Sequence, residues 1–219
     1  MLNFAFDCDG TLVDSEPLHN RADVTILAQY GIILDPHEHR RRSTGIGRAA
    51  MLRIIEQEHR VKLPSDIEQQ IEAELHRLVM ADLQPIASIP HVLKILANRG
   101  ARLAVASNSH RPYIEHALEK SGLRGFFGDR IASADQVART KPAPDVYLLA
   151  AKLLDAEPGD CIAIEDSPVG VAAAHAAAMK TIGFCPSDHV FTPRLLTDAG
   201  ASSVITDMEQ LLDHLGQWH

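Results

Sequence analysis

The sequence lacks a long apolar run, a long basic run and any leader-like segment. No uninterrupted apolar stretch among its 219 residues approaches the length that spans a membrane, and no charged-then-apolar leader precedes Leu2. The formal net charge is -8, and no run of lysine and arginine could follow a polyanion. We therefore expect neither a membrane nor a nucleic acid as a partner.

Cysteines are few, and their spacing fits no zinc site. Cys8, Cys161 and Cys185 are odd in number, and two of them fall in apolar, strand-like runs. We interpret all three as buried thiols in a reducing compartment, and we expect a cytoplasmic protein. The sequence also has no internal repeat and no low-complexity linker. Its composition, 46% apolar and 23% charged, is that of a globular protein of one or two domains.

A pair of aspartates follows the first apolar run. Leu2 to Phe6 predicts a buried strand that ends at Asp7. Asp7 and Asp9 are followed at once by Gly10 and Thr11, which favours a sharp turn with both carboxylates at one site. Such a pair can divide the roles of nucleophile and acid/base. A strand that ends in a polar turn also explains a lone Asp-x-Asp, so the later chain has to decide.

Residues 15–84 show helical patterns and no strand pattern. The predicted helices are Pro17–Tyr30, about Gly47–Arg60 and Ser65–Leu83. Pro85 then favours an extended connection at the preceding residue. We therefore predict an all-helical domain over residues 15–85, inserted into a core domain formed by residues 1–14 and 86–219.

From Pro90 onward, helices and strands alternate. The later predicted strands are Arg102–Ala106, about Arg130–Ser133, Cys161–Ile164, Thr181–Phe184 and Ser203–Ile205. The predicted helices pass through Val92–Leu96, Pro112–Gly122, Pro144–Leu154, Pro168–Met179 and Met208–Leu215. This alternation indicates an α/β fold, a doubly wound, Rossmann-like parallel sheet with helices on both faces. Ligands bind at the carboxyl ends of the strands in such sheets.

Four polar clusters follow predicted strands or lie in the loop after one. They are Asp7 with Asp9, Ser107 with Asn108, Lys141, and Glu165 with Asp166. Taken singly, each has a plain structural explanation: serine and asparagine cap helices, a lysine in a proline-rich loop is usually solvated, and acids favour helix starts. Together they place one acid pair opposite another at a single sheet edge, which independent helix caps do not predict.

The two acid pairs would form an oxygen-rich pocket without cysteine or histidine. Such a pocket suits a hard divalent cation, Mg2+ before Zn2+. A phosphate group beside carboxylates is repelled by about 4 kcal/mol per charge pair at about 4 Å and an effective dielectric constant of about 20. A metal ion together with Lys141 would reverse that sign, which makes phosphoryl transfer the natural chemistry.

These residues resemble the four motifs of the haloacid dehalogenase superfamily. The matching stretches are DCDGTLVDS at 7–15, Ser107-Asn108, KPAPD at 141–145 and EDS at 165–167. The resemblance covers essentially the whole chain and is strongest to phosphatases and phosphomutases with a helical cap after the first motif; similar bacterial members include 6-phosphogluconate phosphatases. It implies a core with the first strand central, and a mobile cap that shuts over the substrate.

The resemblance implies a role for each acid. Asp7 would be the nucleophile that forms an aspartyl-phosphate, and Asp9 would be the general acid and base. The Mg2+ ligands would be the Asp7 carboxylate, the backbone carbonyl of Asp9 and Asp166. Glu165 would support the metal or bind it through water. The name-giving dehalogenases lack the second acid of the first motif, so Asp9 makes them a poor match.

The resemblance also implies the groups that hold the phosphate. Lys141 would neutralise the nucleophile and the transferring group. Ser107 and the backbone amides from Asn108 onward would bind phosphoryl oxygens. Thr11 occupies the motif position that helps to orient the acid/base aspartate, and completes this set.

Three functions stay open at this point. The first is a Mg2+-dependent phosphomonoester hydrolase acting on a small phosphorylated metabolite, a sugar or sugar-acid phosphate. The second is a beta-phosphoglucomutase-like isomerase, and the third is a non-catalytic protein that only binds metal or ligand. Mutases use a cap lysine, and no lysine occurs between Lys62 and Lys94, which favours hydrolysis. Every motif residue is present, which argues against the binding protein.

The helical insert offers two candidate substrate contacts. Arg48, in the turn Gly45–Arg48, could hold a second phosphate or acidic group, since arginine suits anion binding. His19 is a candidate for cap closure, and a helix surface position explains it equally well. Arg40 to Arg42 read as a solvated face. We expect a monomer or a small homo-oligomer.

Overall fold

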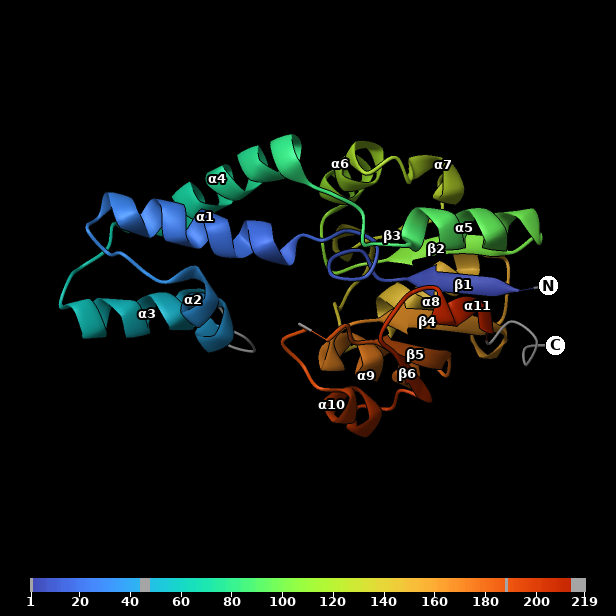
Figure 1. Ribbon diagram of the computed structural model, residues 1–219. Helices are drawn as coiled ribbons and strands as arrows, with labels where there is room; N and C mark the ends of the chain where they lie inside the picture. The colour runs from blue at the N-terminus through green and yellow to red at the C-terminus, as the bar shows by residue number, and fades with distance from the viewer. Residues whose placement is uncertain (1, 44–47, 188, 214–219) are drawn as a thin grey trace. The chain divides into compact units, whose positions relative to one another are not determined.

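The computed structural model describes most of the chain, over the ranges 2–43, 48–187 and 189–213. The chain divides into two compact units (Figure 1). One unit combines Met1–Asp14 with Gln84–His219, and the other is Ser15–Leu83. Gly45 to Gly47 of the expected turn lie outside the described residues. Each unit is described separately below.

The first unit contains a six-stranded parallel sheet in the order β3-β2-β1-β4-β5-β6 (Figure 1). Its strands are β1 (Asn3–Phe6), β2 (Arg102–Ala106), β3 (Ile131–Ala132), β4 (Cys161–Glu165), β5 (Lys180–Phe184) and β6 (Ser203–Ile205). The first strand is central, and the order reverses beside it, which is the doubly wound arrangement. The predicted α/β fold class is confirmed.

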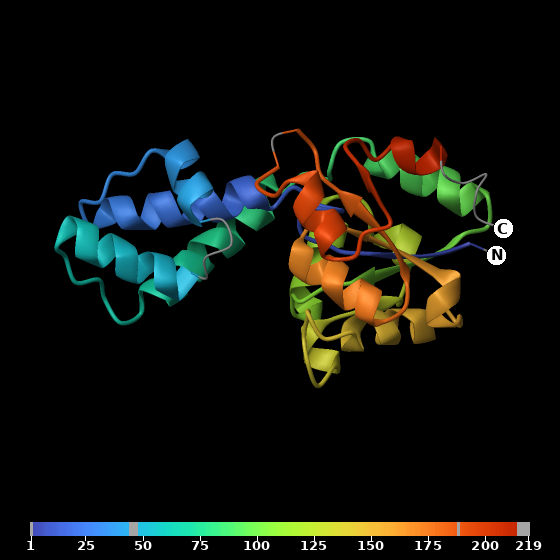
Figure 2. The ribbon, with the colours of Figure 1, turned by 90° about the horizontal axis from the view of Figure 1, so that it is seen from below.

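Helices cover both faces of this sheet. Helices α5 and α11 lie on one face, and α8 and α9 lie on the other (Figure 2). The helices are α5 (Ile89–Asn98), α6 (Arg111–Lys120), α7 (Arg124–Phe127), α8 (Asp145–Leu153), α9 (Pro168–Ala176), α10 (Pro193–Asp198) and α11 (Gln210–Asp213), with 3-10 turns η1 (Ala134–Gln136) and η2 (Pro158–Asp160). Helices α7 and α10 were not predicted, because four and six residues are too few to show helical periodicity.

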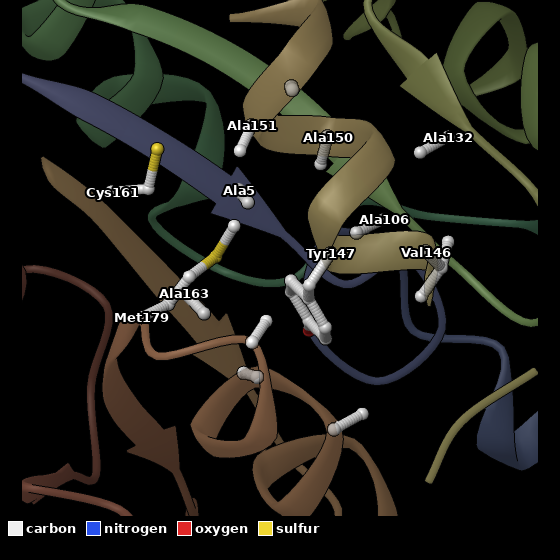
Figure 3. Close-up of a cluster of buried hydrophobic side chains, with 14 of the residues drawn as sticks. Ala5, Ala106, Ala132, Val146, Tyr147, Ala150, Ala151, Cys161, Ala163 and Met179 are labelled. Atoms are coloured by element: carbon white, nitrogen blue, oxygen red, sulfur yellow. The ribbon is translucent and has the colours of Figure 1, made fainter. Parts of the chain in front are cut away.

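The two faces of the sheet differ in side-chain size. Along β1, Phe4 and Phe6 point to one face and Ala5 to the other, as the pleat requires. The ring of Phe6 meets that of Phe127 edge-on at 6.3 Å. On the Ala5 face, alanines of the sheet meet alanines of α8 and α9, around the large ring of Tyr147 (Figure 3). Small residues on both sides let these two helices pack closely on the sheet, as expected for the alanine-rich stretch of α9.

The described residues of the second unit form helices joined by loops, with no strand among them. Its helices are α1 (Glu16–Gln29), α2 (Pro36–Ser43), α3 (Arg48–His59) and α4 (Ile67–Asp82). Helix α2 was missed, because its sequence PHEHRRRS has no apolar stripe and buries only His39. In α2, Arg42 donates to Glu58 in an exposed pair, in line with the solvated face expected there.

The segments that leave and re-enter the sheet unit lie side by side. Val13 and Pro85 form an antiparallel bridge, and the backbone N–H of Asp14 donates to the carbonyl of Gln84 at 3.0 Å. The helical unit is therefore attached through two paired segments directly after the first motif.

Two further expectations concern the cysteines and the membrane. All three cysteines are buried and unpaired, as predicted. Within the part of the chain that the structure describes, no helix has the length and apolar character to cross a membrane.

Candidate active site

The four polar clusters meet at the carboxyl edge of the sheet. Phe6 in β1 pairs with Val105 in β2 and with Ile164 in β4, so the residues after these three strands are neighbours. Asp7 continues this pairing, because its N–H donates to the carbonyl of Ile164 at 3.0 Å. Lys141 reaches the same edge from the loop before α8. Side chains that are far apart in sequence therefore share one site.

Lys141 connects two of the acids in this cluster. Its ammonium group donates to Asp7 Oδ1 and to Glu165 Oε1, each at 2.5 Å. Lys141 and Asp7 are 8% exposed and Glu165 is fully buried, so water screens these charges little. The charge-assisted bonds fix the orientation of both carboxylates around one cation.

Burial and charge act on these groups in opposite directions. Burial lowers the pKa of Lys141, but the charges of Asp7 and Glu165 outweigh it, so the pKa is raised and the lysine stays protonated. Burial raises the pKa of Asp7 well above its ordinary value, and the carboxylates of Glu165 and Asp166 add to this, whereas Lys141 lowers it. The isolated cluster therefore holds more negative charge than it can easily accommodate.

This excess charge fits a divalent cation. The ligand oxygens of Asp7, Glu165 and Asp166 lie within 4.8 Å of one another, and all three residues are buried. Lys141 neutralises one of the three carboxylates, which leaves two negative charges in a pocket of oxygen donors. Such a donor set suits Mg2+. Asp7 and Asp166 fit the role of direct ligands better than Glu165, because both oxygens of Glu165 accept hydrogen bonds from protein groups.

Glu165 accepts hydrogen bonds from protein groups on both of its carboxylate oxygens. Its Oε1 accepts from Lys141 and from the hydroxyl of Tyr147 at 2.7 Å, and its Oε2 accepts from the hydroxyl of Ser167 at 3.2 Å. A Cβ on Gly170 would lie about 2 Å from this carboxylate, as near as 1.9 Å to Oε1. Only glycine therefore leaves room for Glu165, whose position orients Lys141.

Asp166 is held from the side of the C-terminal loop. Burial raises its pKa to about 6, against the lowering effect of a hydrogen bond from His189. His189 Nε2 lies 3.2 Å from Asp166 Oδ2, and its Nδ1 accepts the N–H of Phe191 at 3.2 Å, which assigns the proton to Nε2. Gly10, at φ +80°, passes so close that a Cβ would lie 2.1 Å from the same carboxylate oxygen.

Asp9 is held by two hydroxyl groups. Tyr113 donates to its Oδ1 at 2.7 Å and Ser109 donates to its Oδ2 at 3.0 Å. Asp9 was expected to be oriented with the help of Thr11. Thr11 is instead fully buried, with a hydroxyl that has no hydrogen-bond partner among the described residues.

Ser107 and Asn108 occupy different environments. Ser107 is 2% exposed, and its Oγ accepts the N–H of Ser109 at 3.0 Å, so its own proton can be donated to a ligand. The amide of Asn108 pairs with the backbone of Lys141: its Oδ1 accepts the lysine N–H at 2.8 Å and its Nδ2 donates to the lysine carbonyl at 3.3 Å. The side chain of Asn108 thus fixes the lysine loop, and its contact with phosphate stays a prediction.

The candidate residues of the helical unit meet one another there. Arg48 lies 3.4 Å from Asp23, 3.3 Å from Glu72 and 3.4 Å from Nδ1 of His19. Asp23 also contacts the buried His39 at 3.1 Å. Arg48 is therefore paired with two carboxylates inside its own unit, and its contact with substrate stays a prediction.

Sequence reasoning missed four residues that contact this site: Ser109, Tyr113, Tyr147 and His189. Tyr147 lies in the helix that follows the lysine motif, and its ring lies 5.0 Å from Lys141 Nζ. A tyrosine at a buried helix position reads as core, and this one is also core (Figure 3). The one signal in the sequence was its hydroxyl, because a buried hydroxyl needs a hydrogen-bond partner. The other three carry no local signal.

Comparisons with known proteins agree with this geometry. A family model for haloacid dehalogenase-like hydrolases matches residues 1–178. The 6-phosphogluconate phosphatase of Escherichia coli (strain K12) is 34% identical over 185 residues, which are 84% of this chain and 82% of that protein.

Solved structures cover nearly the whole chain. A HAD family hydrolase from Deinococcus radiodurans R1, with bound phosphate and sodium, superimposes with a TM-score of 0.87 at 30% identity, over 98% of this chain and 95% of that one. A Thermotoga maritima protein described as a candidate beta-phosphoglucomutase has a TM-score of 0.85 at 27% identity, over 99% of both chains. The resemblance drawn from the four motifs is confirmed, and the chain belongs to the haloacid dehalogenase-like hydrolase family.

Proposed function

We propose that this protein is a Mg2+-dependent phosphatase of a small phosphorylated metabolite, a sugar or sugar-acid phosphate, and that Asp7 carries the phosphoryl group during turnover. The observation that carries this proposal is the buried Asp7 held 2.5 Å from the ammonium group of Lys141, among carboxylates that suit a divalent cation. The broader assignment, a hydrolase of phosphoric monoesters, is confirmed by the family match and by the relative named as a phosphatase.

Asp7 is suited to in-line attack on phosphorus. Lys141 donates to one of its oxygens and favours its ionised form, which is the nucleophilic one. Attack forms a bond from an Asp7 oxygen to phosphorus and breaks the bond from phosphorus to the ester oxygen. The positive charge of Lys141 also lies where the transferring group gains negative charge.

The metal site fits a role beside the nucleophile. Asp7, Asp166 and the backbone carbonyl of Asp9 would hold Mg2+, with Glu165 behind them as the partner of Lys141. When bound, Mg2+ supplies positive charge that draws phosphoryl oxygens toward the carboxylates. The repulsion it offsets is about 4 kcal/mol per charge pair at about 4 Å and an effective dielectric constant of about 20.

Asp9 supplies and then recovers a proton. Its carboxyl group gives the proton to the leaving ester oxygen, which departs as an alcohol. Its carboxylate then takes a proton from the water that attacks phosphorus, which releases phosphate and restores Asp7. Ser107 can donate its hydroxyl proton to a phosphoryl oxygen at the same sheet edge.

The relatives and the helical unit support the proposed substrate class. A sugar-acid phosphate is the substrate named for the Escherichia coli relative, and this chain is 34% identical to that protein. We assign residues 15–85 as a cap, in which Arg48 and His19 would contact the part of the substrate remote from the phosphate. Because the chain as a whole has a formal net charge of -8, such a local cation is important for an anionic metabolite.

A mutase is the second candidate, because of the similarity to the Thermotoga maritima protein. The test is phosphate release from a panel of sugar and sugar-acid phosphates with Mg2+, together with glucose 1-phosphate and a bisphosphate primer. Free phosphate supports the hydrolase, and glucose 6-phosphate supports the mutase. Asp7→Asn serves as the matched blank. If the wild-type protein turns over no ester, the result supports the third alternative, a non-catalytic protein that only binds metal or ligand.

A further inference from the structure

We propose that Tyr113 is a positioning residue that, with Ser109, aims the carboxyl group of Asp9 at the leaving oxygen of the substrate. The role of Asp9 as acid and base rests on the proposed function above. Neither hydroxyl belongs to the four motifs, and both reach Asp9 from the segment around the start of α6.

The geometry fixes the carboxylate in two places at once. Tyr113 donates to Oδ1 at 2.7 Å and Ser109 donates to Oδ2 at 3.0 Å. The terminal torsion of an aspartate is otherwise broad, so a bond on each oxygen is what selects one orientation. Asp9 and Tyr113 are both half-buried, so water competes less for these bonds than at an exposed site.

A carboxylate can accept more hydrogen bonds than these two hydroxyls donate. Its two oxygens offer about four lone-pair positions. The hydroxyls of Tyr113 and Ser109 each use one of these positions, one on each oxygen. Asp9 can thus be held and remain able to exchange a proton.

Hydroxyl groups are also the right kind of partner for an acid and base. A hydroxyl can donate or accept, whereas an ammonium or guanidinium group can only donate. When Asp9 carries its proton, one partner hydroxyl can turn and become the acceptor. The pair therefore holds Asp9 both before it protonates the ester oxygen and after it has lost that proton.

The consequence is a dependence on the leaving group. An alkoxide or an unsubstituted phenolate leaves poorly without a proton, whereas 4-nitrophenolate is a stable anion that needs little help. General acid catalysis contributes about 100-fold to 10,000-fold where it operates. We expect Tyr113→Phe to lower kcat/KM about 10-fold for phenyl phosphate and less than about 2-fold for 4-nitrophenyl phosphate, since Ser109 still holds one oxygen.

The experiment measures kcat/KM with Mg2+ for a series of substituted phenyl phosphates, because this ratio reports the step in which the ester bond breaks. The variants are the wild type, Tyr113→Phe, Asp9→Asn and the double variant. Tyr30→Phe is the matched control, since it removes a 2.7 Å hydroxyl bond to Gln70 in the helical unit.

The expected result is a steeper dependence on leaving-group pKa for Tyr113→Phe and an unchanged one for Tyr30→Phe. Adding Tyr113→Phe to Asp9→Asn should then change the slope no further, because the acid is already absent. An equal loss on every ester, no loss, or faster turnover of phenyl phosphate would each overturn the proposal.

A second measurement separates this inference from the proposed function. Crystal structures of the wild type and Tyr113→Phe show directly whether the Asp9 carboxylate is bound by both hydroxyls and turns when one is removed. If the wild type hydrolyses no ester, the proposed function fails, and these structures still decide the placement. A wild-type Asp9 that points away from Tyr113 would overturn the positioning claim.

Discussion

Replacing Asp166 by asparagine should stabilise the metal-free protein at neutral and alkaline pH. Asp166 is 8% exposed and lies among Asp7, Glu165 and Lys141. Asparagine has nearly the same shape, and its side-chain oxygen can still accept the hydrogen bond from His189. The substitution therefore removes a buried negative charge and little else.

The size of the effect follows from the pKa of Asp166. Burial raises this pKa from 3.8 to about 6, which corresponds to about 3 kcal/mol of differential free energy between the two protonation states. The folded protein holds the proton more tightly than the unfolded chain does. The stabilisation from Asp166 is therefore complete below about pH 3.8 and is lost as the pH rises through about 6.

The measurement is the free energy of unfolding in urea with EDTA, at pH 4 and pH 8. Asp166→Asn should exceed the wild type by about 0.5 kcal/mol at pH 4 and by about 3 kcal/mol at pH 8. Asp129→Asn removes the same charge from a side chain that is 98% exposed, and serves as the matched control. Adding Mg2+ at pH 8 should then stabilise the wild type, by about 2.7 kcal/mol at 100 times the dissociation constant, and not Asp166→Asn.

A difference between Asp166→Asn and the wild type that is the same at pH 4 and pH 8 would refute the reasoning. It would mean that Asp166 ionises in the folded, metal-free protein as easily as in the unfolded chain. The cluster would then be wetter than its burial indicates, and an excess of negative charge would not be what prepares it for a cation.

Three further substitutions test other parts of the structure. Asp7→Asn should abolish phosphate release while circular dichroism shows the wild-type fold; turnover near the wild-type rate would contradict covalent attack. Gly170→Ala should destabilise the fold by about 3 kcal/mol in urea unfolding because its Cβ collides with Glu165, whereas Gly125→Ala, with open space around it, should not. Arg48→Ala should change the ranking of metabolites in a phosphate-release screen more than it changes hydrolysis of 4-nitrophenyl phosphate, and equal losses would make Arg48 structural.

Much of the fold could be predicted because its signals are local. The strand at the N-terminus, the alternation after Pro90 and the stripe of apolar residues in α4 each depend on neighbouring residues alone. Helix α2 could not be predicted in this way, since its stability depends on partners outside it, such as the contact of His39 with Asp23. A helix without an apolar stripe becomes visible only when its neighbours are placed.

The residues of the candidate site also fall into two groups, those with a signal in the sequence and those that only the fold brings in. Asp7, Lys141 and Asp166 were predicted to meet because parallel strands end at one edge, and the structure brings them together. Tyr113 and His189 contact the site across more than 20 residues of sequence, from a helix face and a loop that carry no motif. These contacts depend on the direction in which each side chain points in the folded protein, and the sequence alone does not predict that direction.

The buried charges connect the stability of this protein to its chemistry. Lys141 pairs with Asp7 and Glu165 through bonds of 2.5 Å, but one ammonium group cannot balance three buried carboxylates. Gly10 and Gly170 lie so close to Asp166 and Glu165 that a Cβ at either position would collide with the carboxylate, so the packing accommodates the acids only where they are. The core therefore holds the acids together against their mutual repulsion, and a bound cation relieves that repulsion in the folded state alone. The affinity for the cation and the instability of the metal-free protein therefore have the same cause, the packing of these acids. A substitution that removes one of their negative charges should weaken metal binding and stabilise the metal-free fold.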